Sequence, residues 1–247
     1  MEEWQSVAGM RLDRVLSQQG IASRKELREI IRSGRVSVDG TPCRRPEEKV
    51  DPESQVIRLD GQALRCRRFH YYMMDKPSGV LTATEDRRQP TVLDLLPEEL
   101  RRLGLFPVGR LDKDTSGLLL LTDDGDLAHR VISPKFSVEK RYYACIEGEV
   151  DAQDAAAFAA GLTLGDGTVC RPAKLESLGP GRCLVTVTEG KYHQVKRMLA
   201  ARGKPVVQLR RLSVGALELD GDLGPGCLRE LGEEDLCKLF RTGIGEN

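Results

Sequence analysis

The segment Gly109-Arg110-Leu111-Asp112-Lys113-Asp114-Thr115-Ser116-Gly117 runs directly into four leucines at positions 118–121. This apolar run ends at the turn-forming residues 122–125. A short apolar run that is bounded so closely by turn residues favours a buried β-strand over a helix. The sequence therefore predicts a charged turn held by a buried strand, and such a turn can fix the carboxylate of Asp112 in one position.

The same turn has two other interpretations. Asp112, Asp114 and Ser116 have the spacing with which a calcium-binding EF-hand loop begins. The loop then departs from that pattern, because position nine is Leu120 and position twelve is Asp123 in place of the bidentate glutamate. Calcium binding is therefore not favoured. A simple role for Asp112 as a turn-capping residue stays open on the spacing alone.

The composition is that of a soluble globular protein. The chain has 247 residues, of which 40% are hydrophobic and 31% are charged, enough for one large and one small domain. No apolar run approaches the roughly 20 residues that a membrane span requires. The first ten residues lack the basic and then apolar pattern of a secretory signal, so we expect a cytoplasmic protein without membrane contact.

The seven cysteines show neither CxxC spacing nor pairing with histidines. We therefore expect reduced thiols, most of them packed, and no metal site. They are Cys43, Cys66, Cys145, Cys170, Cys183, Cys227 and Cys237.

The overall charge balances at 38 basic and 38 acidic residues, so only its distribution can indicate a nucleic-acid partner. Residues 10–45 contain nine lysines and arginines against four acids, and residues 191–211 contain seven against none. A charged segment is often only a solvated surface. Because both segments accompany recognisable motifs, we predict that they contact an anionic partner.

Residues 10–67 are predicted to form a small domain of two helices and a short sheet. Apolar residues recur at helical spacing before Gly20, and Ser23-x-x-Glu26 is a capping box that opens a second helix, which ends at Gly34. One face of the second helix is apolar and the rest is basic. Hairpin signals follow at Asp39-Gly40 and at residues 60–61.

This segment resembles the S4-type RNA-binding module, in which the second helix and adjoining loop lie against structured RNA. The resemblance implies that the basic face contacts phosphates, which position a protein without reading sequence. The helix N-terminus at Ser23 serves as a cap and also offers N–H donors to a phosphate. The implied RNA-binding residues here are Ser23, Arg24, Lys25, Arg28 and Arg32.

Residues 69–241 are predicted to form the larger domain. Strands at residues 71–74 and 80–82 flank the turn Lys76-Pro77-Ser78-Gly79, which we interpret mainly as architecture. We also expect two strands around residues 165–167, strands within residues 206–219 that expose Arg210 and Arg211, and a terminal helix at residues 233–240.

The motif at residues 109–117 resembles the GRLDxxTxG motif of the pseudouridine synthases, specifically of the RsuA/RluB branch that modifies ribosomal RNA. The resemblance implies that Asp112 is the catalytic residue. The Lys-Pro-x-Gly turn matches a weaker first motif of the family. Arg110, which adjoins Asp112, would fill the space left by the target nucleotide or hold a phosphate, with a structural salt bridge as the alternative.

Two further segments match the same family. The strand at residues 139–148 is similar to its Lys-x-Tyr motif, which implies that Tyr142 stacks on the target base, with Tyr143 on the opposite face. The segment Glu189-Gly-Lys-Tyr-His-Gln-Val-Lys-Arg-Met198 opens a helix in which Lys196 aligns with the basic partner of the catalytic aspartate and Arg197 faces solvent. His193 can bond within its loop, and a catalytic histidine is not favoured because no nucleophile stands beside it in the sequence. Leu199, on the apolar side of this helix, is assigned to substrate contact.

Together these patterns predict an α+β fold, in which the S4-type domain precedes a mainly antiparallel sheet with flanking helices. The resemblance implies that a uridine in ribosomal RNA is isomerised to pseudouridine without metal or cofactor. It is strongest to the small-subunit (16S) branch. A large-subunit (23S) enzyme and a non-catalytic RNA-binding assembly factor are the alternatives. The expected partner is ribosomal RNA or an assembly intermediate, and the expected state is a monomer.

Overall fold

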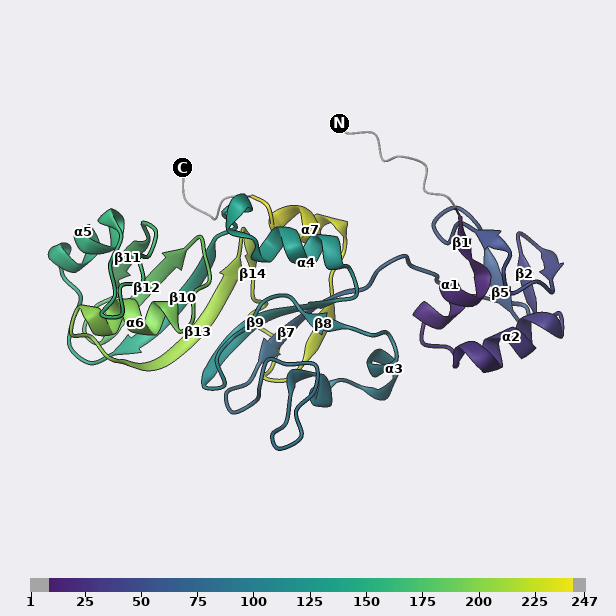
Figure 1. Cartoon of the computed structure of the whole chain (residues 1–247), viewed down its shortest axis with the longest axis horizontal. Helices are drawn as coiled ribbons and strands as arrows, with labels where there is room; N and C mark the ends of the chain where they lie inside the picture. The colour runs from purple at the N-terminus through teal and green to yellow at the C-terminus, as the bar shows by residue number, and fades with distance from the viewer. Residues whose placement is uncertain (1–8, 242–247) are drawn as a thin grey trace. The chain divides into compact units, whose positions relative to one another are not determined.

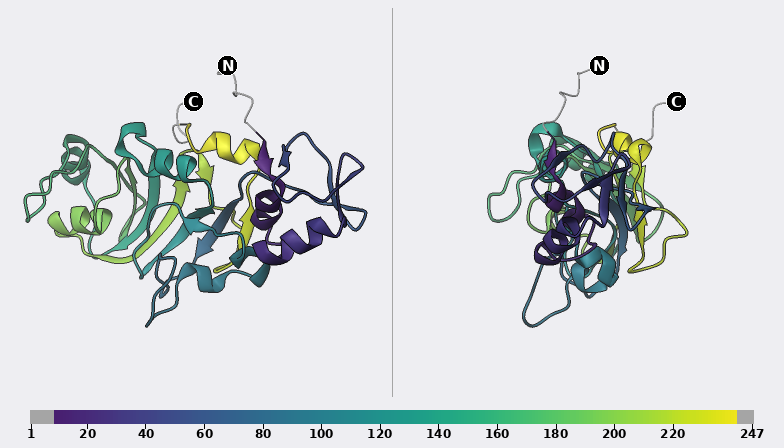
Figure 2. Two further views of the ribbon diagram at one scale, coloured as in Figure 1. Left: turned by 45° about the vertical axis from the view of Figure 1, so that its right-hand side comes forward. Right: turned by 90° about the vertical axis from the view of Figure 1, so that its right-hand side faces the viewer.

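The computed structural model describes residues 9–241, and Figures 1 and 2 show its elements. The chain divides into two compact units. One consists of Met1–His70 with Leu96–Leu105, and the other of Tyr71–Leu95 with Phe106–Asn247. The division at residue 70 lies close to the predicted boundary at residues 67–69, whereas Leu96–Leu105 groups with the first unit.

The first unit has the predicted helices and short strands. The helices α1 and α2 pack on a four-stranded antiparallel sheet of order β3-β2-β5-β6, and β1 pairs with β4. Apolar residues from both helices and the sheet form one core, which includes Leu16, Leu27 and Ile57. The bounds are β1 Met10–Arg11, α1 Leu12–Gln18, α2 Arg24–Arg32, β2 Val36–Val38, β3 Thr41–Cys43, β4 Lys49–Val50, β5 Ile57–Leu59, β6 Gln62–Ala63 and α3 Glu98–Arg101.

The second unit is built on a nine-stranded sheet with the main order β11-β12-β10-β13-β9-β7-β15. Every pairing in it is antiparallel except that of β9 with β13. The predicted α+β class and mainly antiparallel sheet are thus confirmed. The strands are β7 Tyr71–Lys76, β8 Phe106–Pro107, β9 Thr115–Thr122, β10 Lys140–Ile146, β11 Lys174–Ser177, β12 Arg182–Val187, β13 Val206–Val214, β14 Leu217–Glu218 and β15 Leu228–Glu230.

Helices cover the two halves of this sheet separately. Figure 1 shows α5 and α6 beside the half that contains β10–β13, and α4 and α7 beside the half around β9. Each half has its own core, with Phe158 and Met198 in the first and Leu118 and Val131 in the second. The helices are η1 Val92–Leu95, α4 Gly125–Ile132, η2 Pro134–Phe136, α5 Ala152–Ala160, α6 Gln194–Ala201 and α7 Glu233–Lys238.

The leucine run forms the buried strand that the sequence predicts. Leu118, Leu119 and Leu121 are completely buried in β9. At the start of this strand, Gly117 lies opposite Arg211 of β13 and has a φ of +105°. A Cβ atom at this glycine would lie 2.2 Å from the backbone oxygen of Arg211, so only glycine lets the two strands approach this closely.

Three sequence-based predictions about strands in this unit are wrong. Residues 80–82 form no strand, and only Leu81 makes an isolated bridge, to Thr91, because the chain turns away from the sheet after β7. Around residues 165–167 there is only an isolated bridge between Thr163 and Val169, because the backbone there forms a turn and not two strands. Arg211 is not exposed, because β13 lies between β10 and β9, and only 4% of its surface is accessible. The Nε of Arg211 donates to the backbone oxygen of Leu118 at 2.7 Å. Arg210 is half-buried and forms an ion pair with the buried Asp75 at 2.9 Å.

All seven cysteines are free, with Cys170 and Cys183 buried and Cys227 and Cys237 exposed. Between residues 9 and 241, no helix is long and apolar enough to cross a bilayer. The same part of the chain has no cluster of three or more histidine, cysteine or acidic side chains that could hold a metal ion.

Candidate active site

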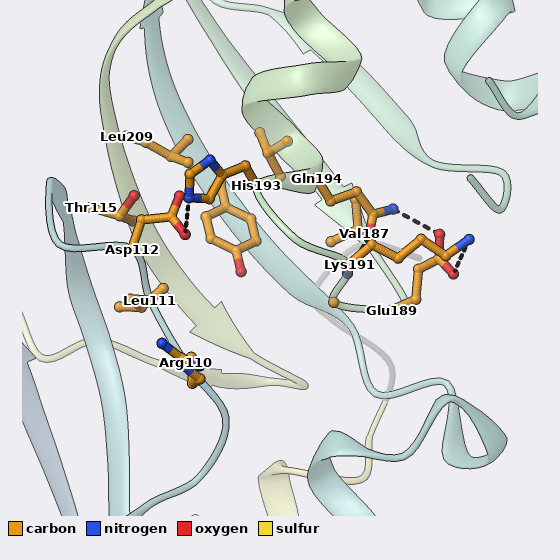
Figure 3. Close-up of a pocket in the computed structure, with 13 residues that line it drawn as sticks. Arg110, Leu111, Asp112, Thr115, Val187, Glu189, Lys191, His193, Gln194 and Leu209 are labelled. Atoms are coloured by element: carbon orange, nitrogen blue, oxygen red, sulfur yellow. Dashed lines mark hydrogen bonds and ion pairs between the residues drawn. The ribbon is translucent and has the colours of Figure 1, made fainter. Parts of the chain in front are cut away.

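A cavity of about 70 Å³ lies at the end of the motif loop in the second unit, where the halves of the sheet meet (Figure 3). Arg110, Leu111 and Asp112 from the loop, Tyr142 from β10 and Leu209 from β13 are among its lining residues. The parallel pairing of Thr115 with Leu209 joins β9 to β13, and β13 pairs in turn with β10. The cavity therefore forms because segments that are far apart in the sequence become neighbouring strands.

The turn at residues 76–82 holds the loop that carries Asp112. The Thr82 hydroxyl donates to the oxygen of Leu111 at 2.7 Å and accepts from its N–H at 3.2 Å. The N–H of Gly79 donates to the oxygen of Lys113 at 2.7 Å. The Lys-Pro-x-Gly turn is thus architectural, as expected, and the loop it positions is the one that carries the candidate catalytic residue.

Lys76 makes the most extensive of these contacts. Its side chain is completely buried, and its ammonium donates to the backbone oxygens of Pro77, Asp112, Lys113 and Thr115 at 2.9, 3.2, 3.3 and 2.9 Å. Burial lowers the pKa of Lys76 to about 8, against the opposing charges of Asp114 and Asp112. A single buried cation thereby joins both ends of the loop to the strand β7.

The predicted pair of Asp112 and Lys196 is present. The Nζ atom of Lys196, in the first turn of α6, lies 3.0 Å from Oδ2 of Asp112 and 2.5 Å from Oδ1 of Asp114. Burial alone would lower the pKa of Lys196, but the hydrogen bonds to the two carboxylates raise it above its ordinary value. Asp112 is 26% exposed, so a substrate can reach its carboxylate while Lys196 stays charged beside it.

His193 is a second partner of Asp112. Its Nε2 lies 3.5 Å from Oδ1 of Asp112, a contact marked by a dashed line in Figure 3. Its ring stacks on that of Tyr192 with the centroids 3.8 Å apart. His193 also has a left-handed backbone, with φ 48° and ψ 34°. Such a conformation costs a residue other than glycine about 1–3 kcal/mol and clusters at functional sites. His193 therefore contacts its loop neighbour Tyr192 and also Asp112, and the sequence did not predict the second contact.

Tyr142 and Arg110 both line the cavity, as the sequence predicts. Tyr142 is half-buried and packs against the core of the β10–β13 half, which leaves part of its ring for a ligand. Arg110 is exposed, and the described residues 9–241 contain no ion pair of its side chain, so the alternative of a structural salt bridge is not supported.

Leu199 does not contact the cavity, which corrects its assignment as a substrate-binding residue. It is completely buried in the core below α6, together with Val195 and Met198. Its helical position places it on the packed face, where RNA cannot touch it. Arg197 is likewise not turned freely to solvent, because it is 28% exposed and pairs with Asp166 at 2.6 Å.

The predicted RNA-binding residues of the S4-type unit lie on the surface of α2. Arg24, Lys25, Arg28 and Arg32 are all exposed. At the N-terminus, Ser23 and Glu26 form the predicted capping box, in which Glu26 accepts from the N–H of Ser23 at 2.9 Å. This carboxylate already occupies the helix end, so a phosphate there would have to compete with it.

The residues that sequence reasoning missed act through tertiary contacts. Lys76 was visible in the sequence as part of the Lys-Pro-x-Gly turn, but its burial beneath the motif loop was not predicted. His193 and Asp114 had none, because their contacts with Asp112 and Lys196 depend on the docking of α6 beside the loop. The assembled site presents an accessible carboxylate, a fixed cation and an aromatic ring. This set can carry out nucleophilic or base catalysis on a flat ring substrate.

Comparison with known proteins identifies the family of both units. Residues 70–201 match the family model of RNA pseudouridylate synthases, and residues 10–56 match that of the S4 domain. Over 231 residues the chain is 47% identical to an uncharacterized RNA pseudouridine synthase, YtzG, of Bacillus subtilis, a match that covers 92% of this chain and 97% of the relative.

Two further relatives extend over nearly the whole chain. Ribosomal small subunit pseudouridine synthase A of Escherichia coli is 42% identical over 232 residues, which are 93% of this chain and 100% of that protein. A crystal structure of a pseudouridylate synthase is 35% identical with a TM-score of 0.66, and the match covers 93% of this chain and 99% of that one. The chain therefore belongs to the RNA pseudouridine synthase family and carries an S4 domain ahead of its synthase domain.

Proposed function

We propose that this protein isomerises a specific uridine of small-subunit (16S) ribosomal RNA to pseudouridine, with Asp112 as the catalytic carboxylate. The observation that carries the proposal is the 3.0 Å pair of Asp112 and Lys196 at a solvent-open cavity that Tyr142 also lines. The choice of the small subunit rests on the 42% identity to a synthase whose name specifies that subunit.

The reaction requires few groups. The bond between the base N1 and the sugar breaks, the base turns over, and its C5 carbon bonds to the same sugar carbon, while the C5 proton leaves and the freed N1 takes up a proton. The composition and oxidation state of the nucleotide are therefore unchanged. Asp112 supports this chemistry by attack on the sugar, by attack on the base or by proton abstraction. Lys196 places a positive charge 3.0 Å from the Asp112 carboxylate in each case.

The remaining residues serve RNA binding in this proposal. Removal of the uridine from its stack costs a few kcal/mol, and stacking on Tyr142 returns roughly 1–3 kcal/mol. Arg110 fills the vacated space or binds a phosphate. The basic face of α2, with Arg24, Lys25, Arg28 and Arg32, contacts phosphates elsewhere on the RNA. We propose that the protein acts as a cytoplasmic monomer on ribosomal RNA or an assembly intermediate.

The test compares wild type with Asp112→Asn in release of tritium from small-subunit RNA labelled at C5 of its uridines. We expect the rate to fall at least about 10³-fold, while RNA binding remains, because the substitution preserves shape and removes the charge. Asp222→Asn, at an exposed position outside the cavity, is the matched control and should retain full activity. Absence of release by the wild type would refute the proposal.

The choice of subunit has its own test. Pseudouridines are mapped in ribosomal RNA from cells with and without the gene. We expect one site in small-subunit RNA to be lost. Loss of a site only in large-subunit RNA would replace the proposed substrate with the alternative one.

A further inference from the structure

Tyr192 is the most exposed large hydrophobic side chain among residues 9–241, with 76% of its surface accessible. It lies at the rim of the catalytic cavity, since its neighbours Lys191 and His193 both line that cavity. Its exposure is not explained by the packing of α6, whose apolar residues are buried. An aromatic ring in water at the mouth of a catalytic site is suited to a flat ligand.

The position of this ring is fixed relative to Asp112. One face of Tyr192 stacks on His193 with an interplanar angle of 19°, and His193 in turn contacts Asp112. The other face of the tyrosine ring is left for a partner. A base on that outer face would be separated from Asp112 by two ring layers, so it cannot be the base that reacts.

The loop that carries Tyr192 is held by buried hydrogen bonds. Glu189 and Gln194 are 5% and 4% exposed, and the Nε2 of Gln194 donates to Oε1 of Glu189 at 2.8 Å. The N–H of Lys191 donates to Oε1 of Gln194 at 2.9 Å. Because the loop is ordered before any ligand arrives, binding to the ring loses little conformational freedom.

The surroundings of the ring favour a nucleic acid over a protein partner. Arg110 lines the same cavity with an exposed side chain that has no ion pair among residues 9–241. The lysines and arginines of residues 191–211 pair with acidic residues or, in the case of Arg211, are buried, so the free positive charge near the ring is that of Arg110. Aromatic rings that stack on bases beside a positive surface are the usual combination in sites for unpaired RNA.

We propose that Tyr192 is a nucleotide-stacking residue whose outer face binds the base next to the uridine that enters the cavity. This inference rests on the proposed function and names a contact that holds the RNA on one side of the target. His193 acts as a positioning residue for the tyrosine, since its ring supports the inner face.

The experiment measures kcat and KM for tritium release from small-subunit RNA with wild type, Tyr192→Ala and Tyr192→Phe. We expect Tyr192→Ala to raise KM roughly 5- to 100-fold, as loss of a base–aromatic stack does, with kcat changed less than about twofold. Tyr192→Phe keeps the ring and should stay near wild type. Val207→Ala, at an exposed position outside the cavity, should change neither constant.

A second measurement separates this inference from the proposed function. The dissociation constant for the RNA is determined with Asp112→Asn and with the double variant Asp112→Asn, Tyr192→Ala, so that no turnover is needed. Weaker binding by the double variant supports the stack even if wild type proves inactive. Equal binding, or a Tyr192→Phe variant as impaired as Tyr192→Ala, would overturn it.

Discussion

At the scale of single residues, the site depends on a lysine that never meets the substrate. Lys76 is completely buried and donates to four backbone oxygens, two of which belong to Asp112 and Lys113. Burial disfavours the charged form of Lys76, and this lowers its pKa to about 8. The carbonyl oxygens that surround it offset part of that cost, and the loop is fixed as a result.

Lys76→Met preserves the length of the side chain but removes every donor. We expect a loss of at least about 1–3 kcal/mol in the free energy of unfolding, because buried carbonyls lose their partner. We also expect kcat to fall at least about tenfold, since Asp112 is no longer held beside Lys196. Urea denaturation and tritium release measure the two effects. Lys174→Met, at a lysine that is 69% exposed, should show neither effect.

The pH dependence of this variant gives an independent check. The folded-state pKa of Lys76, about 8, lies below the ordinary lysine value of 10.5, so the unfolded chain binds more protons between these values. Stability from this group therefore rises with pH across that window. The margin by which wild type exceeds Lys76→Met should grow from pH 8 to pH 10.5. A constant margin would show that Lys76 titrates normally.

The resemblance of three motifs to the family was sufficient to predict that Asp112, Tyr142 and Lys196 lie together, while their roles stay predictions. The sequence could not predict Lys76 as the support of the loop, since a lysine in a turn next to proline is ordinary by composition. Leu199 was misassigned for the opposite reason. Its place in a motif suggested function, while its position on the apolar face of α6 already indicated burial.

At the scale of elements, the parallel pair of β9 and β13 joins the two halves of the sheet. The leucine run was sufficient to predict β9, because a short apolar run between turns has few other solutions. The burial of Arg211 was not predictable, since it depends on which strands flank β13. Gly117 makes the pairing possible through its positive φ and its contact with the backbone of Arg211.

Gly117→Ala should separate β9 from β13 locally. The added Cβ would meet the backbone of Arg211 at 2.2 Å in a conformation that alanine rarely adopts. We expect a loss of roughly 2–5 kcal/mol by urea denaturation, together with most of the activity. Gly167→Ala is the matched control, since Gly167 also has a positive φ, +82°, but no atom within 4 Å of its Cβ position. It should lose about 1–2 kcal/mol. Equal losses of unfolding free energy in the two variants would mean that the clash of the added Cβ with the backbone of Arg211 does not destabilise the protein.

At the scale of the whole molecule, the S4 domain and the synthase domain lie in two units with separate cores. The net charge of zero gives no indication of an RNA-binding surface, whereas the excess of basic residues within residues 10–45 does. Arg32 is exposed, and the residues between 9 and 241 offer it no ion pair. Arg35, just beyond the end of the same helix, pairs with Asp60 at 2.6 Å.

Binding of small-subunit RNA should therefore respond differently to the two arginines. Arg32→Gln should weaken binding for all RNA sequences and reduce the slope of log K against log salt by about 1. Arg35→Gln should change the slope less, because Asp60 already neutralises that guanidinium. Filter binding over a range of salt concentrations measures both slopes. A larger change for Arg35→Gln would place the RNA contact away from the exposed face of α2.

The pairing of Thr115 with Leu209 also has a consequence for synthesis of the chain. These partners are more than 90 residues apart, so the strands on either side of the cavity meet late in folding. While a ribosome still holds the last third of the polypeptide, β9, which follows the loop of Asp112, cannot yet pair with β13. A nascent chain is therefore inert until β13 emerges, and an enzyme of ribosomal RNA becomes competent only after its own translation is nearly complete.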